Sequence, residues 1–135
     1  MSPSSPHLLV IEDDAFMAAL LRFLLERQGL QVTVLGDGRA ALECLQSEAR
    51  FDAVVLDLRL PQVSGMEVLT RMRALAAWSC TPVLVLSALD GGQEVAAALD
   101  AGAGDYLTKP FDPQELLARL RRLLPDALAR TGVEA

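Results

Sequence analysis

The sequence has few aromatic residues and only two cysteines. Phe, Trp and Tyr make up 4% of the 135 residues, whereas 52% of all residues are hydrophobic. A single domain with an aliphatic core is therefore expected. The cysteines, Cys44 and Cys80, lie far apart in the sequence and form no CxxC pair. This spacing argues against a metal knuckle or a redox pair and favours reduced thiols that pack as small hydrophobic residues.

The sequence also lacks an excess of basic residues and a long hydrophobic run. Twelve Lys and Arg stand against 18 Asp and Glu, which gives a net charge of -6. Because phosphate backbones are bound by clustered basic side chains, this balance argues against nucleic-acid binding by this domain. No apolar run reaches the roughly 18 residues that a membrane span needs, and the polar start MSPSSPH lacks a basic signal segment. We therefore expect a cytoplasmic protein without membrane contact.

Short apolar segments alternate with helical patterns along the chain. Several of the apolar segments show no polar alternation, which is typical of parallel strands covered by helices on both faces. The predicted strands are residues 8–11, 30–35, 52–58, 82–87 and 105–108, and the predicted helices are residues 14–28, 38–48, 65–76, 93–101 and 113–124. Five β-α units joined by right-handed crossovers predict an α/β fold with a doubly wound parallel sheet.

Helix-capping residues support these limits. Asp14 is placed to cap the first helix and Gly29 to end it, while Asp112 and Pro113 open the last helix. We expect one domain over residues 7–124, a disordered N-terminal tail over residues 1–6, and a C-terminal tail or the start of a linker over residues 125–135.

Polar residues follow the apolar strands at their carboxyl ends. Glu12 and Asp13 follow the first strand, and Asp57 ends the third. Ser87 ends the fourth strand and Lys109 follows the fifth. In an open parallel sheet, ligands bind beyond the carboxyl ends of the strands, where the winding reverses. The sequence therefore predicts that these five side chains meet in one cleft.

Three carboxylates in one cleft require a cation. Two like charges about 4 Å apart repel by about 4 kcal/mol at an effective dielectric constant near 20. Mg2+ suits a site with few carboxylates, because it keeps waters that phosphate oxygens can replace. With a lysine and a hydroxyl nearby, this set is suited to forming an acyl phosphate, in which Asp57 is the nucleophile.

Four motifs occur in order along the chain: VIEDD, VVLDLRLPQVSG, VLVLSA and GAGDYLTKPF. Together they resemble the receiver domains of bacterial two-component response regulators, over about residues 7–124. The resemblance implies a flavodoxin-like sheet with strand order 2-1-3-4-5. It also implies a phosphorylation-dependent signalling switch that receives its phosphoryl group from a histidine kinase or a histidine phosphotransfer protein. Such a domain is no enzyme beyond its own phosphorylation and dephosphorylation, and the sequence identifies no downstream target.

The resemblance also assigns roles to individual residues. Pro110 is expected to follow a cis peptide bond. Arg59, two positions after Asp57, lies where family members carry varied side chains that tune hydrolysis of the phosphoryl group. By similarity, Glu12 and Asp13 hold Mg2+ together with Asp57, Asp57 is the phosphoacceptor, Ser87 is the switch hydroxyl, Tyr106 is the switch aromatic residue and Lys109 contacts the phosphoryl group.

Simpler interpretations stay open for several of these residues. Ser87 can be an ordinary hydroxyl at a strand end, Tyr106 a half-buried strand residue and Arg59 a solvated surface residue. Two other functions are alternatives for the whole chain. A haloacid-dehalogenase-type phosphatase needs a second Asp two positions after the nucleophile, where this chain has Arg59. A non-phosphorylated receiver-like interaction module has typically lost one of the acids or the lysine, and here all are present.

The first predicted helix carries more apolar residues than one core-facing stripe needs. Phe16, Met17, Leu20, Leu21, Phe23, Leu24 and Leu25 cover more than half of its circumference at about 100° per residue. In similar receivers a kinase or phosphotransfer helix packs on this helix. We predict that Met17 and Leu21 are exposed and form this docking site. The alternative is that these residues pack under neighbouring loops.

The remaining expectations concern the two ends of the sheet and the last helix. His7 is expected to be solvated, and Trp78 to pack at the end of the sheet opposite the cleft. The segment ELLARLRRLL resembles the last helix of DNA-binding regulators, which dimerise through the fourth helix, fifth strand and fifth helix. Gly104 and the alanines at 96–98 lack the full set of charges of that dimer. A phosphorylation-dependent homodimer therefore stays open.

Overall fold

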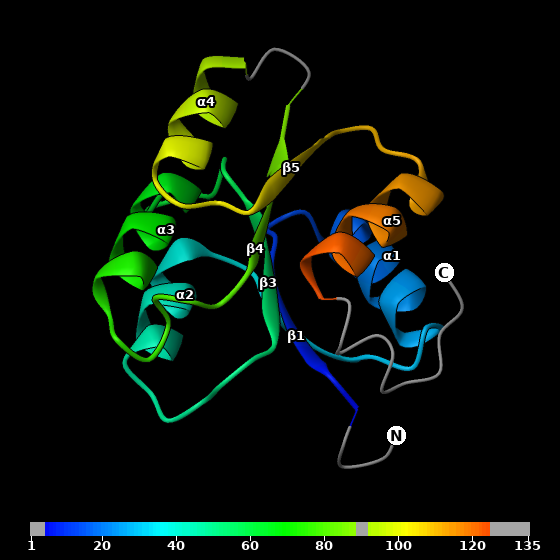
Figure 1. Ribbon diagram of the computed structural model, residues 1–135, viewed down its shortest axis with the longest axis horizontal. Helices are drawn as coiled ribbons and strands as arrows, with labels where there is room; N and C mark the ends of the chain where they lie inside the picture. Colours follow the sequence, from blue (N-terminus) through cyan, green and yellow to red (C-terminus); the bar gives the residue numbers. More distant parts are fainter. Residues whose placement is uncertain (1–4, 89–91, 125–135) are drawn as a thin grey trace.

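The computed structural model describes residues 5–88 and 92–124. A parallel sheet divides the molecule, with α2, α3 and α4 on one face and α1 and α5 on the other (Figure 1). The elements are β1 (His7–Ile11), α1 (Ala15–Glu26), β2 (Gln31–Leu35), α2 (Gly38–Leu45), β3 (Ala53–Asp57), α3 (Gly65–Ala74), β4 (Val83–Ser87), α4 (Gly92–Asp100), β5 (Asp105–Thr108) and α5 (Pro113–Leu123).

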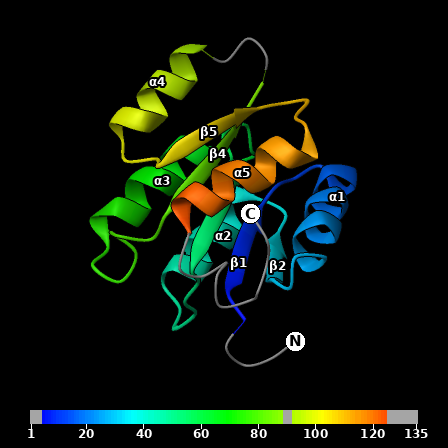
Figure 2. The ribbon, with the colours of Figure 1, turned by 45° about the vertical axis from the view of Figure 1, so that its right-hand side comes forward.

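The strand order is β2-β1-β3-β4-β5, which confirms the predicted doubly wound sheet. All four strand pairs are parallel, and Figure 2 shows the strands fanned by the sheet twist. The register aligns the strand ends: Ile11 pairs with Leu56, and Ser87 pairs with Thr108. Glu12, Asp57 and Lys109 therefore reach the same edge of the sheet.

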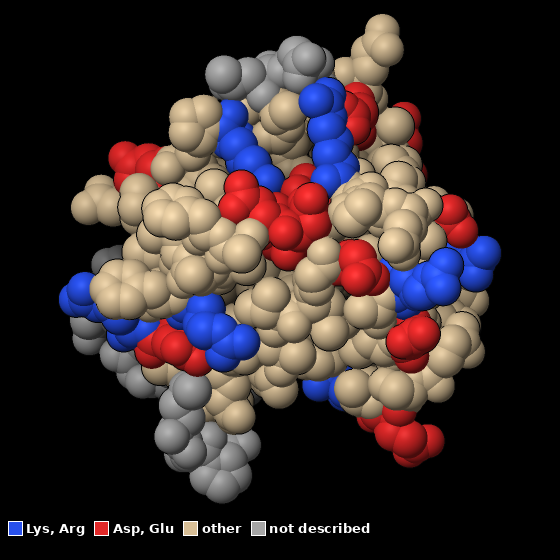
Figure 3. Space-filling model, turned by 180° about the vertical axis from the view of Figure 1, so that it is seen from behind, with Lys and Arg blue, Asp and Glu red and all other residues tan. Residues whose placement is uncertain are grey.

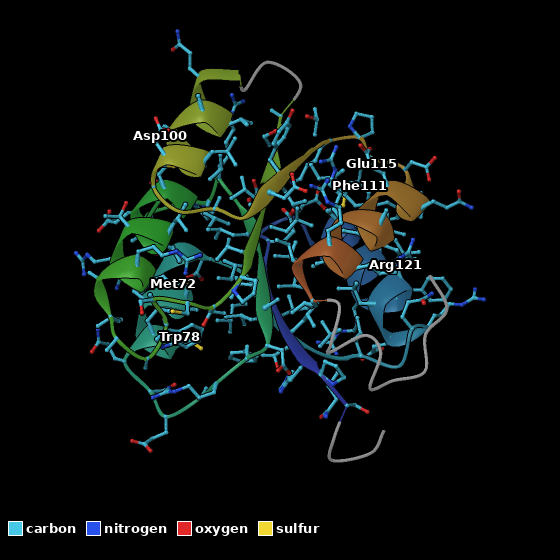
Figure 4. The ribbon with its side chains drawn as sticks, in the orientation of Figure 1. Met72, Trp78, Asp100, Phe111, Glu115 and Arg121 are labelled. Carbon is cyan, nitrogen blue, oxygen red and sulfur yellow. The ribbon has the colours of Figure 1, made fainter. Side chains whose placement is uncertain are left out.

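Each face of the sheet has its own core. In β1, Leu8 and Val10 pack toward α1 and α5, whereas Leu9 and Ile11 pack toward α2 and α3. Figure 4 shows Met72 and Trp78 on the side of α2 and α3, and Phe111 on the side of α5. Trp78 is 1% exposed, which confirms its predicted packing role. Apart from Trp78 and Met72, the buried residues of both clusters are aliphatic.

The predicted capping residues act as expected. The carboxylate of Asp14 accepts hydrogen bonds from the backbone N–H groups of Phe16 and Met17, and Asp112 caps α5. Gly29 and Gly102, after α1 and α4, have φ of 84° and 111°, a conformation that favours glycine. An N-cap side chain such as that of Asp14 stabilises a protein by about 1 kcal/mol.

Two expectations about the N-terminus need correction. Pro6 is buried and its carbonyl oxygen accepts a hydrogen bond of 2.8 Å from the backbone N–H of Gln31, so the ordered domain starts before the predicted boundary at residue 7. His7 is half-buried rather than solvated, because its Nε2 lies 2.7 Å from Oγ1 of Thr33 and its ring packs edge-on against Phe51. Residues 1–4 and 125–135, the rest of the two predicted tails, lie outside the described residues.

Among residues 5–88 and 92–124, every helix is too short or too polar to cross a bilayer.

Candidate functional site

Three carboxylates gather at the carboxyl edge of the sheet. One oxygen from each of Glu12, Asp13 and Asp57 lies within 4.8 Å of the other two. Glu12 follows β1 and Asp57 ends the adjacent strand β3, so the strand register brings them together. Both are buried, whereas Asp13 is exposed and opens the cluster to solvent. Figure 3 shows acidic side chains gathered on this face beside basic side chains.

Lys109 extends from the end of β5 into the same cluster. Its Nζ lies 2.7 Å from Oε1 of Glu12 and 3.1 Å from Oδ2 of Asp57. Its backbone N–H donates a hydrogen bond of 2.8 Å to the carbonyl oxygen of Ser87, which fixes the lysine to β4. The Lys109–Pro110 peptide bond is cis, as the resemblance to receiver domains implied. Through its side chain and its backbone, Lys109 thus contacts three other predicted site residues, Glu12, Asp57 and Ser87.

Burial and charge set the protonation of these groups. Burial raises the pKa of Glu12 to about 7, although the hydrogen bond from Lys109 opposes the rise, and the neighbouring Asp57 adds to it. Burial alone would lower the pKa of Lys109, but its hydrogen bonds with Glu12 and Asp57 outweigh that effect and raise it. Lys109 therefore stays charged at neutral pH and offsets part of the negative charge.

The loop after β3 holds Asp57 in place. The backbone N–H of Arg59 donates a hydrogen bond of 3.0 Å to Oδ1 of Asp57. Gly65 begins α3 so close to the backbone of Asp57 and Leu58 that a β-carbon at position 65 would collide with it. A glycine is therefore required where α3 starts, and the loop returns tightly beside Asp57.

The carboxylate set fits a hard divalent cation. Glu12, Asp13 and Asp57 offer oxygen ligands only, and a site with few carboxylates suits Mg2+. Asp14 lies next in sequence, but its Oδ1 accepts the two hydrogen bonds that cap α1. The structure thus supports the interpretation of Asp14 as a cap rather than a ligand.

The two predicted switch residues differ in burial. Ser87 is 3% exposed, and its Oγ has no hydrogen-bond partner among the residues that the structure describes. Such a hydroxyl is uncommon, since most buried polar groups are hydrogen-bonded. Tyr106 is 36% exposed, and the guanidinium of Arg119 lies 5.8 Å from its ring centroid. Tyr106 therefore lies at the surface rather than in the cleft.

Arg59 has a partner that the sequence did not indicate. Its Nε and Nη2 both donate to Oε1 of Glu94, at 3.1 and 2.7 Å. Glu94 lies in the first turn of α4, 35 positions further along the chain. Arg59 is therefore more than a solvated surface residue, because it links the loop after Asp57 to a helix.

The predicted docking residues on α1 are wrong in part. Leu21 is fully buried, and Met17 is half-buried against the same core. The buried stripe of the helix is Ala18, Leu21 and Leu25, which share one face at helical spacing. The exposed apolar residues are instead Phe16, at 79%, and Phe23, at 55%. They lie seven positions apart and so share the outer face of α1.

A groove of about 420 Å³ lies between α1 and the end of β2, next to the acidic cluster. Glu12 and Asp13 line it at the acidic cluster, and Ala19 and Arg22 line it along α1. Gly36, just after β2, forms part of the opposite wall. The groove therefore connects the acidic cluster with α1, at residues other than Phe16 and Phe23.

The fold and the residues at the strand ends are together those of a receiver domain. The family model of the response regulator receiver domain matches residues 8–121. The chain belongs to this family.

Curated relatives of the chain are bacterial regulators. The transcriptional regulatory protein TcrA of Mycobacterium tuberculosis is 46% identical over 129 residues, which cover 96% of this chain and 48% of TcrA. The DNA-binding response regulator MtrA of the same species is 40% identical over 124 residues, 92% of this chain and 53% of MtrA. The chain thus spans about half the length of these relatives.

Solved structures agree with the assignment. The receiver domain of a Francisella response regulator superposes with a TM-score of 0.80 at 35% identity, over 94% of this chain and 99% of that one. The receiver domain of the sensor histidine kinase PA1611 from Pseudomonas aeruginosa superposes with a TM-score of 0.81 at 31% identity, over 90% of this chain and 99% of that one. That structure has a magnesium ion coordinated in its active-site cleft.

Proposed function

We propose that this receiver domain is a signalling switch that accepts one phosphoryl group on Asp57 in the presence of Mg2+. The observation that carries the proposal is the meeting of Glu12, Asp13, Asp57 and Lys109 at one edge of the sheet. The donor is a phosphohistidine on a histidine kinase or on a histidine phosphotransfer protein.

The transfer is a substitution at phosphorus. A carboxylate oxygen of Asp57 attacks the phosphorus, a P–O bond forms, the P–N bond to the histidine breaks, and the imidazole nitrogen keeps the bonding electron pair. Lys109, 3.1 Å from Asp57, is placed to pair with a phosphoryl oxygen. Glu12, Asp13 and Asp57 would hold Mg2+, which neutralises charge on the phosphoryl oxygens when it is bound.

The reverse of the switch is hydrolysis. Water attacks the phosphorus, the P–O bond to Asp57 breaks, and inorganic phosphate leaves while the carboxylate is restored. The chain acts only on itself in this scheme. The phosphatase alternative lacks support, because Arg59 occupies the position of the second acid and its side chain is bound to Glu94.

The response to phosphorylation starts at Ser87. An aspartyl phosphate brings about one additional negative charge and three acceptor oxygens into the cleft. The buried Oγ of Ser87 is able to donate to one of these oxygens, which would satisfy a group that has no partner among the described residues. Movement at the end of β4 would then reach Tyr106 on β5, which pairs with Val85 of β4.

Two surfaces would bind partners, one for the phosphodonor and one for a second copy of the chain. We place the phosphodonor on α1, where Phe16 and Phe23 are exposed and where a groove lined by Ala19 and Arg22 leads to Asp13. A phosphorylation-dependent homodimer would use the face of α4, β5 and α5, where Leu99 and Tyr106 are exposed. Because TcrA and MtrA are named as a transcriptional and a DNA-binding regulator, the switch would control DNA binding by a part of the protein outside this acidic domain.

Labelling by a small phosphodonor tests the proposal. Incubated with Mg2+ and acetyl phosphate, the wild-type protein should gain the mass of one phosphoryl group, and Asp57→Asn should gain none. Equal labelling of the two proteins would refute the assignment of Asp57.

A further inference from the structure

The outer face of α1 carries a row of apolar side chains. Phe16 and Phe23 are 79% and 55% exposed, and Leu20, between them, is half-buried. The spacing of four and then three residues places them in one row, on the side of α1 opposite the buried stripe that contains Leu21. Figure 2 shows α1 at the outer edge of the molecule. Exposed aromatic residues in a row are typical of a contact between proteins.

The two ends of this row carry opposite charges. Asp13 is exposed just before the N-terminal end of α1, and Arg27 is exposed just after its C-terminal end. Within residues 5–88 and 92–124 neither side chain forms an ion pair, because Lys109 pairs with the other two acids of the cluster. The guanidinium of Arg27 lies 5.5 Å from the ring centroid of Phe23 and so stays beside the apolar row. Each end of the row therefore offers a charge to a partner.

Such a row is complementary to itself when it is turned end to end. A two-fold axis midway between Phe16 and Phe23 places each phenylalanine against the other phenylalanine of a second copy, with the two Leu20 side chains between them. From this midpoint Arg27 lies about 11 Å and Asp13 about 10 Å along the helix, in opposite directions. Two antiparallel α1 helices therefore bring Arg27 of each copy level with Asp13 of the other, where the pair can form a charge-assisted hydrogen bond.

We propose that a second copy of this chain packs antiparallel on α1 in the unphosphorylated, metal-free protein, with Phe16 against Phe23 and Arg27 of each copy on Asp13 of the other. The second copy thereby adds a cation to the acidic cluster, to which Asp13 belongs. One pair of helices buries less surface than a standard interface, so the dimer is weak and depends on protein concentration. It covers the surface on which we place the phosphodonor; this consequence, unlike the dimer itself, rests on the proposed function.

Charge reversal tests the pairing of Arg27 with Asp13. Sedimentation equilibrium, with a chelator and without a phosphodonor, should show wild type shifting from monomer to dimer as its concentration rises to the millimolar range. Arg27→Glu and Asp13→Lys should each weaken dimerisation by about tenfold or more, because each places like charges opposite one another at both ends of the interface. Arg39→Glu is the matched control and should leave the dimer unchanged, since Arg39 is an exposed arginine on α2, on the other face of the sheet.

An equal mixture of Arg27→Glu and Asp13→Lys gives the sharper result. In a mixed dimer the two substituted side chains face each other with opposite charges, and the native Arg27 of one copy faces the native Asp13 of the other. The mixture should therefore dimerise about as tightly as wild type, which two misfolded variants would not do. A wild type that stays monomeric at millimolar concentration, a dimer that Arg27→Glu leaves intact, or a mixture that stays monomeric would each overturn the inference. None of these results affects labelling of Asp57 by acetyl phosphate, which tests the proposed function separately.

Discussion

The ammonium group of Lys109 lies 2.7 Å from Oε1 of Glu12, a residue 97 positions earlier in the chain. The contact joins the end of β5 to the end of β1 across the two strands between them. Glu12 is almost fully buried, and the positive charge of Lys109 stabilises the ionised form of Glu12 when no metal ion is bound.

The stability of the metal-free protein should depend on the protonation of Glu12. Its pKa is raised from 4.5 to about 7 in the folded protein, chiefly by burial. The folded state therefore binds the proton more tightly than the unfolded state, and the stabilisation is present in full below pH 4.5 and is lost as the pH rises to about 7. The free energy of unfolding should fall over this window by up to about 3 kcal/mol.

The variant Glu12→Gln isolates this effect. Urea unfolding at pH 5 and pH 7, with a chelator present, should show a smaller fall in the free energy of unfolding for Glu12→Gln than for wild type. The same fall in both proteins would mean that another group titrates in this range.

Asp13 should contribute to Mg2+ affinity more than its neighbour Asp14. Asp13→Asn removes a charged oxygen ligand from the cluster and should weaken Mg2+ binding by at least about tenfold. Asp14→Asn is the matched control, because asparagine caps a helix as well as aspartate does. Calorimetric titration of both variants gives the affinities. A similar loss in the two variants would place the metal elsewhere.

Ser87→Ala should cost the unphosphorylated protein little stability. Its Oγ is buried without a partner among the described residues, so its removal loses no hydrogen bond seen in the structure. Ser64→Ala provides the contrast, because Ser64 caps α3 by accepting a hydrogen bond from the N–H of Glu67, and its loss should cost about 1 kcal/mol. Denaturant unfolding measures both. A loss for Ser87→Ala as large as that for Ser64→Ala would show that Ser87 has a structural partner.

Phe16 and Phe23 should be needed for phosphoryl transfer from a protein donor but not for labelling by acetyl phosphate. Each is exposed on α1, so Phe16→Ala and Phe23→Ala should slow transfer from a cognate phosphohistidine donor and leave labelling by acetyl phosphate unchanged. Leu21→Ala should instead lower the free energy of unfolding by about 2–5 kcal/mol, because it leaves a cavity in the core. Slower labelling by both donors in the phenylalanine variants would argue against a docking role.

Most of the site could be predicted because it depends on the ends of strands. Apolar runs identify the parallel strands, and the carboxyl ends of such strands meet at one edge. Glu12, Asp13, Asp57 and Lys109 are therefore brought together by topology alone, whatever the details of packing. The resemblance to receiver domains added the strand order and the cis peptide bond, both of which the structure confirms.

The face of α1 was harder to predict because its apolar residues surround most of the helix. The sequence predicted that Met17 and Leu21 are exposed, but the stripe that faces the core is Ala18, Leu21 and Leu25. The pair of Arg59 and Glu94 joins two surface charges 35 positions apart, and no periodicity in the sequence links such positions. The sequence therefore did not predict which side chains of α1 face the core, nor that Arg59 pairs with Glu94.

The position of the phosphoryl group tests the central claim most directly. After labelling with acetyl phosphate and Mg2+, borohydride reduces an aspartyl phosphate to homoserine, and trypsin then releases residues 51–59, a peptide that contains both Asp52 and Asp57. Fragment masses should place the homoserine at position 57, only when Mg2+ was present during labelling. Homoserine at position 52 or in another peptide, or none in the labelled protein, would contradict the account.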